Sequence, residues 1–531
     1  METLPPKHLR FSFFDPLSDP IHKRTFQEKR LIGFAVVVYL LMVIISVMCL
    51  VMKRDALQFH TRDYNYFIEQ AARLTDPQMT KRFSMNIEGY NMLGLQGIEG
   101  SRSLIQAIHT EYFRYAYVLL YGIFHSTLPI YIFYSLIFFL PLLYVVLIAR
   151  PQKPNDSKQA IFFILLFVLF PATLTTVTAD LRPRMLFIAA WCMVVLSVYY
   201  DRPFLEKLVL FGFLIGIREE GIVLGGIVLV LNFLQMQGKT NRWKQTLVFL
   251  FLDILVFGLF LAFMAWGQYN RVDVIFDPRN IFSGLLSERL GIVLGGAALL
   301  VFSLGFTWWK WRQHFLHILM LLVYGSAILI TGIPALKDNA QWYATQSAIA
   351  PVSLWDSFVR AITASQTSLV FYIVILLLVL LLDSMQRRAR VILSSGLLVL
   401  CVISAALTLA TIPPQVAKWS QEMPSARLVW QFVDTHDRYH TNVLLDYSTY
   451  QAFYNYENIL VYNRLPLWLV LPEDRFYPQN KEILVKQIQQ RMEYAVISKE
   501  SLETVRELTR SADVPVTEIA SNDQYVILKL R

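Results

Sequence analysis

Asp63 is the acidic residue best placed for general-base chemistry. It follows the apolar run Leu31–Met52 by about ten residues and lies among aromatic residues in the segment Phe59–Gln70. Aromatic neighbours can partly desolvate a carboxylate and so tune its pKa for proton abstraction. Asp63 also stands directly before an amphipathic stretch, Tyr64–Leu74, where it could act only as a helix cap. Both roles are compatible with one residue.

His109, Glu111 and Arg114 form a second group of polar residues, which leads into an amphipathic aromatic stretch. Glu111 is, with Asp63, a candidate catalytic residue, and His109 and Arg114 are candidate substrate-binding residues. Together the three could ligate a metal ion or bind a phosphate group. The alternative is that Glu111 is a first-turn acid favoured by the helix dipole and that His109 is an exposed loop residue. No DxD or HExxH spacing supports a metal site, so a divalent metal ion is an open cofactor hypothesis.

Two further charged groups lie at the ends of apolar runs. They are Asp180, Arg182 and Arg184 in one short turn, and Arg218, Glu219 and Glu220 in another. Ionisable groups at membrane depth are costly and are therefore functional candidates, and arginines there could clamp a phosphate or diphosphate. The structural alternatives are an Arg218–Glu219 ion pair and snorkelling of the other two arginines to the interface.

The elements that position these residues are expected to be membrane helices. Apolar residues make up 55% of the chain and charged residues 16%, a balance that soluble domains do not show. The sequence therefore predicts an α-helical polytopic membrane protein with about eleven membrane segments of up to about 20 residues. The expected segments are Leu31–Met52, Leu128–Ala149, Ala160–Thr178, Met185–Tyr200, Leu208–Ile217, Ile222–Gln237, Leu247–Trp266, Ile292–Trp309, Phe315–Ile333, Ser368–Leu382 and Val391–Thr411.

The basic residues set the expected orientation. They cluster in short segments between apolar runs, so the net charge of +9 indicates membrane orientation and not a nucleic-acid partner. Lys23, Arg24, Lys29 and Arg30 place the N-terminus in the cytoplasm. The first apolar run has no small-residue cleavage pattern after it, so it is expected to be a retained span and not a signal peptide.

The stretch Leu208–Gln237 decides on which side the rest of the chain lies. We expect two segments joined at Arg218–Glu220, the first about ten residues or ~15 Å long and thus too short to cross a bilayer unaided. The charged turn should then sit in a protein-lined or watery cavity. A single continuous helix is the alternative, and it would move three later basic loops to the outside.

Three regions follow from this topology. Residues 1–30 are expected in the cytoplasm, residues 31–412 form the membrane domain with an outer loop at 53–127, and residues 413–531 form an extracytoplasmic domain. The tail alternates helix and strand patterns, which indicates a small α/β sandwich. The expected helices are Arg427–Thr435, Glu482–Arg491 and Leu502–Thr509, and the expected strands are Asn442–Asp446, Ile459–Tyr462, Tyr494–Ser498, Val516–Ile519 and Tyr525–Leu530.

This layout resembles the C-type glycosyltransferase superfamily, whose multi-spanning members use lipid-linked sugar donors. More narrowly, the order of pieces is similar to an uncharacterised bacterial membrane-protein family near that superfamily. The matching residues are Arg62-Asp63-Tyr64 with Phe67 and Gln70, Ile108-His109-Thr110, Asp180-Leu181-Arg182-Pro183 and Arg218-Glu219-Glu220. The likeness covers most of the chain, through short motifs.

The resemblance implies an inverting sugar transfer from a polyprenyl-phosphate-linked donor at the bacterial inner membrane. By analogy Asp63 would deprotonate the acceptor hydroxyl, while Arg218, with Arg182 or Arg184, would bind the departing phosphate. The implied partners are the lipid-linked sugar donor and membrane lipids. Two other function classes stay open, namely a transporter or flippase of a lipid-linked or anionic substrate and a non-catalytic membrane assembly factor. No internal repeat of the kind that many transporters contain is evident.

Overall fold

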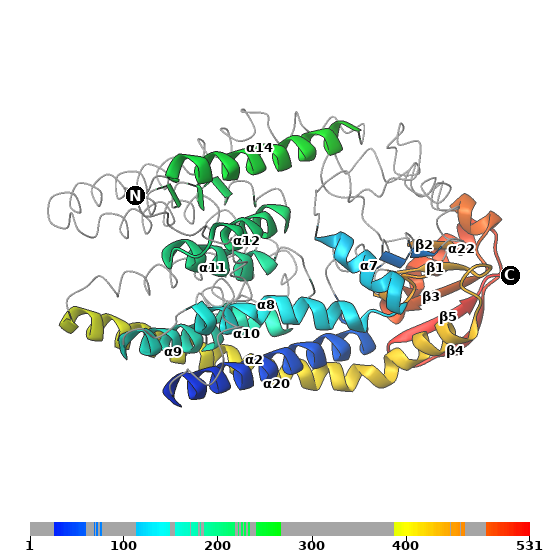
Figure 1. Cartoon of the computed structure of the whole chain (residues 1–531). Coiled ribbons are helices and arrows are strands. Elements are labelled where there is room, and N and C mark those ends of the chain that lie inside the picture. Colours follow the sequence, from blue (N-terminus) through cyan, green and yellow to red (C-terminus); the bar gives the residue numbers. More distant parts are fainter. Residues whose placement is uncertain are drawn as a thin grey trace, which may run out of the picture.

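The structure is a computed structural model of the chain. It describes residues 26–59, 68, 71–72, 75–76, 113–148, 154–169, 171–178, 181, 185–217, 221, 225–226, 228–229, 232–233, 241–266, 387–446, 448–456, 458–461 and 485–531. The described part is mostly helical and carries a small sheet at its C-terminal end (Figure 1). The spans expected at 292–309, 315–333 and 368–382 lie outside the described residues.

Two long apolar helices, α2 (Phe26–Asp55) and α8 (Leu128–Ile148), pack together. Within the described part they are the two helices that are long and apolar enough to cross a membrane, judged by length and composition. The Ser135 hydroxyl donates to Ser46 Oγ over 2.9 Å, and the Tyr39 hydroxyl donates to the Leu136 carbonyl over 3.1 Å. The structure confirms helices over both expected segments; the total of about eleven spans stays a prediction.

The segment expected as one span at Ala160–Thr178 is divided into α9 (Pro154–Leu169) and α10 (Pro171–Thr178). Proline at the start of α10 has no backbone N–H to donate, and its ring clashes with a preceding turn of helix. The Thr173 hydroxyl donates to the carbonyl of Phe167 across the break. Helix α11 (Leu186–Tyr199) follows and is buried from its first residue to Val198, as its uniformly apolar sequence requires.

The next helix, α12 (Phe204–Ile217), forms a hairpin with the helical residues between 221 and 233. A Cβ added to Gly221 would lie 2.4 Å from the Leu214 carbonyl oxygen, and Lys207 Nζ lies 3.3 Å from Asn232 Oδ1. In one continuous helix Lys207 and Asn232 would be ~37 Å apart. The chain therefore folds back between Ile217 and Gly221, which confirms the two-segment prediction.

Two more long helices, with the shorter α7 (Arg114–Phe124), belong to the described helical part. Helix α14 (Arg242–Trp266) packs on α12 on the far side of the bundle from α2 (Figure 1). Helix α20 (Arg387–Thr435) packs on α2 and α10 and then continues to the sheet. It contains the expected span Val391–Thr411 and the expected helix Arg427–Thr435 without a break, because the prolines between them keep the helical φ even where they remove a hydrogen bond.

The sheet has the strand order β2-β1-β3-β5-β4. Its strands are β1 (Asn442–Leu445), β2 (Asn458–Val461), β3 (Tyr494–Ser498), β4 (Thr517–Ser521) and β5 (Tyr525–Lys529). β1, β2 and β3 are parallel, whereas β5 pairs antiparallel with β3 and β4. The end of α20 covers one face and α22 (Leu502–Ser511) covers the other. Each strand lies within two residues of its expected position.

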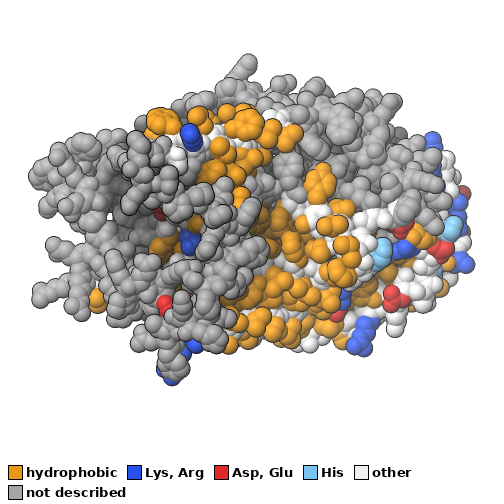
Figure 2. All heavy atoms as spheres, in the orientation of Figure 1, with side chains coloured by type: hydrophobic (Ala, Val, Ile, Leu, Met, Phe, Trp, Pro, Cys, Tyr) orange, Lys and Arg blue, Asp and Glu red, His pale blue; other side chains and the backbone are white. Residues whose placement is uncertain are grey.

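Apolar and charged side chains occupy different parts of the surface of the described residues. Apolar side chains cover much of the visible helical part, whereas charged side chains gather at the end that carries the sheet (Figure 2). On α2 and α14 the outward side chains include Val37, Ile44, Phe251 and Ile254, each more than half exposed. Helices that face lipid present side chains of this kind.

Candidate functional site

The side chains of the predicted site residues lie outside the described part of the chain. These residues are Asp63, His109, Glu111, Asp180, Arg182, Arg184, Arg218, Glu219 and Glu220, together with Arg114, which is described only by its backbone as the first residue of α7 (Arg114–Phe124). The described residues that adjoin these motifs in the sequence include Phe59, Phe113, Thr178 and Ile217.

A buried lysine lies where the end of α2 meets α10, α20 and the C-terminal domain. We call this region the domain junction and define it by Lys53, Phe59, Thr178, Trp419 and Gln451. Lys53 is 6% exposed, and its ammonium donates to the Thr178 carbonyl over 2.9 Å. The ammonium also lies 5.5 Å from the ring centroid of Phe59 and 5.4 Å from that of Trp419, distances at which aromatic faces attract a cation.

The junction also joins the first loop to the C-terminal domain. The backbone N–H of Phe59 donates to Gln451 Oε1 over 3.0 Å. The indole N–H of Trp430, near the end of α20, donates to the Asp55 carbonyl over 3.3 Å. The loop after α2 and the tail therefore meet at the same end of the helices. That this end faces outward stays a prediction.

Two predicted motifs are close to residues of the junction in the sequence. Asp63 is four residues beyond Phe59, and Asp180 is two residues beyond Thr178. Phe59 and Thr178 are the last described residues before these two motifs, and Lys53 contacts both of them. Asp63 and Asp180 themselves lie outside the described residues.

Phe113 is the described residue next to another predicted motif. This residue directly precedes Arg114, and its ring stacks on Phe133 of α8 at 5.6 Å and lies 5.4 Å from the ring of Phe213 in α12. Phe213 is five residues before Arg218. The same end of α8 also reaches the junction, since the ring of Tyr131 lies 6.3 Å from that of Phe59. One end of α8 thus contacts both Phe59 and Phe113.

Helices α11 and α12 form an antiparallel pair. The two helices have 14 residues each, pack against each other and are joined by a short turn at Tyr200–Pro203. The start of α11 and the end of α12 therefore lie side by side. In the sequence Arg182 and Arg184 precede α11 and Arg218 follows α12; these arginines lie outside the described residues.

Glu422 carries a carboxyl close to the domain junction, and it is not among the site residues predicted from the sequence. It lies three residues after Trp419 on α20, and its Oε2 has no hydrogen-bond partner within the described structure. Burial raises the pKa of Glu422, although Lys418, 3.7 Å away, and a hydrogen bond from Gln58 act against that rise. A half-buried carboxyl with a raised pKa is a candidate acid or base. The sequence does not point to Glu422, because Gln58 lies more than three hundred residues away.

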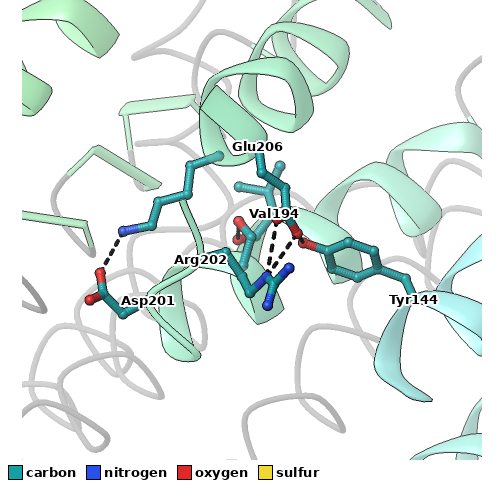
Figure 3. A network of polar contacts seen from close by, with 7 residues as sticks. Tyr144, Val194, Asp201, Arg202 and Glu206 are labelled. Carbon is teal, nitrogen blue, oxygen red and sulfur yellow. Dashed lines mark hydrogen bonds and ion pairs between the residues drawn. The ribbon is translucent and has the colours of Figure 1, made fainter. Parts of the chain in front are cut away.

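A second polar cluster lies at the opposite end of α8 (Figure 3). The Tyr144 hydroxyl donates to Glu206 over 2.6 Å, and Arg202 Nε donates to the same carboxylate over 3.0 Å. Lys207 Nζ donates to Asp201 over 2.8 Å. Glu206 and Lys207 are both buried, but each has an oppositely charged partner. Since the charges are paired, this cluster fixes the start of α12, and we assign it no chemistry.

The described residues contain no group of three or more His, Cys, Asp and Glu side chains that could hold a metal ion. No family model and no curated protein matches the chain. A solved structure that is similar is the crystal structure of ArnT from Cupriavidus metallidurans bound to undecaprenyl phosphate. It is 14% identical, with a TM-score of 0.44, over 94% of this chain and 98% of that chain. A likeness of this degree assigns neither a family nor an activity.

Proposed function

We propose that the protein is a membrane glycosyltransferase. It transfers a sugar from a polyprenyl-phosphate-linked donor to an acceptor hydroxyl on the outer face of a bacterial inner membrane. The observation that carries the proposal is the domain junction, where the segments leading to Asp63 and Asp180 meet at the buried ammonium of Lys53. A buried cation between apolar helices and a polar domain suits a substrate that has a lipid tail, a phosphate and a sugar.

Each predicted residue has a role in this reaction. Asp63 takes the proton of the acceptor hydroxyl, whose oxygen attacks the anomeric carbon as the bond to the donor phosphate breaks. Arg218, with Arg182 or Arg184, neutralises the charge on the departing polyprenyl phosphate. Glu111 is the second catalytic acid, and His109 and Arg114 bind the sugar or its acceptor. Asp180, Glu219 and Glu220 hold the arginines in place by ion pairs.

The test is an Asp63→Asn variant assayed for release of free polyprenyl phosphate. This product is common to every sugar of a donor panel, so the sugar need not be known in advance. Loss of a positioned general base lowers a rate by about 100-fold or more. The matched control is Asp55→Asn, because Asp55 pairs with Arg54 at the surface eight residues earlier. Equal release by Asp63→Asn and by the unaltered protein would remove Asp63 from the mechanism.

A transporter or flippase of a lipid-linked or anionic substrate is the second candidate. The observation in its favour is Asp253 of α14, a buried carboxyl whose Oδ1 has no hydrogen-bond partner among the described residues. Unpaired carboxyls at membrane depth often lie on transport pathways. Protein in liposomes separates the two functions, since a flippase moves labelled polyprenyl-phosphate sugar between leaflets without releasing the sugar.

A further inference from the structure

Asp253 lies on the face of α14 that packs against the α12 hairpin. Its neighbours on α14, Phe251 and Ile254, are exposed and point away from the bundle, whereas Asp253 is 9% exposed. It is eleven residues from the start of α14, or ~16 Å along the helix. The carboxyl is therefore inside the helical part, far from either end of its own helix.

The carboxyl rests against bare backbone. A Cβ added to Gly225 would lie 2.7 Å from Asp253 Oδ1 and 2.7 Å from Ile215 Cγ2. No side chain fits at Gly225 while the carboxyl occupies this position. Asp253 Oδ1 is fully enclosed and has no hydrogen-bond partner among the described residues. Gly225 therefore packs closely on both the Asp253 carboxyl and the Ile215 side chain, so the carboxyl has glycine backbone as a near neighbour.

We propose that Asp253 is a proton-binding site inside the membrane part of the molecule. Its carboxyl carries a proton while the hairpin packs on α14. An ionised carboxylate in such a site needs several hydrogen-bond donors or a cation, whereas a neutral carboxylic acid has to satisfy only one O–H. The site would bind a proton whether or not the protein is a transferase.

The helices packed around Asp253 offer its carboxyl no charged partner among the described residues. On α12 the described charged residues are Glu206 and Lys207, which lie at the other end of that helix and are already paired. On the returning arm the described polar side chain is Asn232, which contacts Lys207. On α14 itself Lys244 lies near the start of the helix, nine residues before Asp253. Within the described part, the carboxyl faces apolar groups.

Carbodiimide labelling of the full chain in membranes tests the proposal. A carbodiimide reacts only with a protonated carboxyl: the acid oxygen bonds to the central carbon, and the proton moves to a nitrogen. At neutral pH we expect apolar dicyclohexylcarbodiimide to label Asp253 and a charged, water-soluble carbodiimide to leave it unlabelled. Glu206 is the internal control, because it is also buried but is ion-paired, and it should be labelled at least tenfold less. Peptide mass spectrometry locates both adducts.

Two variants sharpen the result. Asp253→Asn should lose the adduct and, in the infrared spectrum, the carbonyl band of a protonated carboxylic acid. Gly225→Ala should push the carboxyl out of its site and allow the charged reagent to react. The proposal is wrong if dicyclohexylcarbodiimide fails to label Asp253 in the unaltered protein, or if both reagents label it equally. Since these two outcomes require no variant, a folding defect in a mutant leaves the test intact.

Discussion

At the scale of single residues, Asp446 shows how one carboxylate can hold two loops. It follows β1 and is 1% exposed. Its Oδ1 accepts from the Ser448 hydroxyl and from the N–H and hydroxyl of Thr449. Its Oδ2 accepts from the N–H and hydroxyl of Ser498 and from the Ser501 hydroxyl. The loops after β1 and β3 are therefore joined at the edge of the sheet that faces the junction.

Replacing Asp446 with Asn should weaken this edge by about 3 kcal/mol, because an NH₂ group would face three donors and leave them buried without acceptors. The loss should be visible as faster hydrogen exchange in β1 and β3 of the full chain in detergent. Asp523→Asn is the control, since Asp523 is exposed and accepts one hydrogen bond, from Ser425. Similar exchange in both variants would show that the Asp446 hydrogen bonds contribute little.

Residue types alone pointed to some candidate groups and not to others. Asp63 and Arg218 could be singled out because charges beside long apolar runs are conspicuous. Lys53 could not, because a lysine just after an apolar run is usually a residue at the membrane boundary. Its burial comes from Thr178 and Trp419, which lie more than a hundred residues away in the sequence. Asp253 was missed for a similar reason, since the glycine it faces belongs to another helix.

At the scale of elements, the α12 hairpin depends on glycine at its crossing point. A Cβ on Gly221 would lie 2.4 Å from a backbone oxygen and 2.9 Å from the Ile215 Cα, and backbone atoms cannot easily move away. Gly221→Ala should therefore destabilise the protein by about 1–3 kcal/mol, measured by thermal unfolding in detergent. Gly226→Ala is the matched control, because nothing lies within 4 Å of the added Cβ. Equal melting temperatures would contradict the close packing of the two arms.

Helices and strands were predicted best from the sequence where the residues that mark them are neighbours in the chain. The strands of the tail were placed within two residues, because alternation and turn residues mark them directly. The break near Arg218–Glu220 was also predicted from charge. By contrast, the division at Pro171 and the continuation of α20 through Pro413 and Pro414 were not. A proline can start, bend or end a helix, and the choice depends on what packs around it.

At the scale of the whole molecule, the first loop is fastened to the C-terminal domain at a second point. The Tyr439 hydroxyl donates to Asp76 Oδ2 over 2.7 Å, and Arg438 lies 3.3 Å from the same carboxylate. Burial, followed by the hydrogen bond to Asp76, raises the pKa of Tyr439, so its hydroxyl stays a donor at neutral pH. Close by, Thr75 packs on Gly122 of α7. The loop is thereby held between α7 and the domain.

Tyr439→Phe should loosen this attachment by about 1.5 kcal/mol, because it removes one hydrogen bond to a charged group. We expect faster hydrogen exchange at residues 68–76 and unchanged exchange in β3 and β5. If residues 68–76 exchange as slowly as before, the loop is held by packing on α7 alone. If the strands also exchange faster, the variant has disturbed the domain itself.

The contact between α2 and α20 also sets the order in which the chain can be completed. α2 begins at Phe26 and α20 at Arg387, so the first described helix is finished more than three hundred residues before its partner exists. At about 5–20 residues per second, synthesis of the intervening chain takes roughly 15–65 s. During that time Lys53 lacks the indole that later covers it. The ribosome must therefore nearly finish the protein before its first helix can reach its final environment.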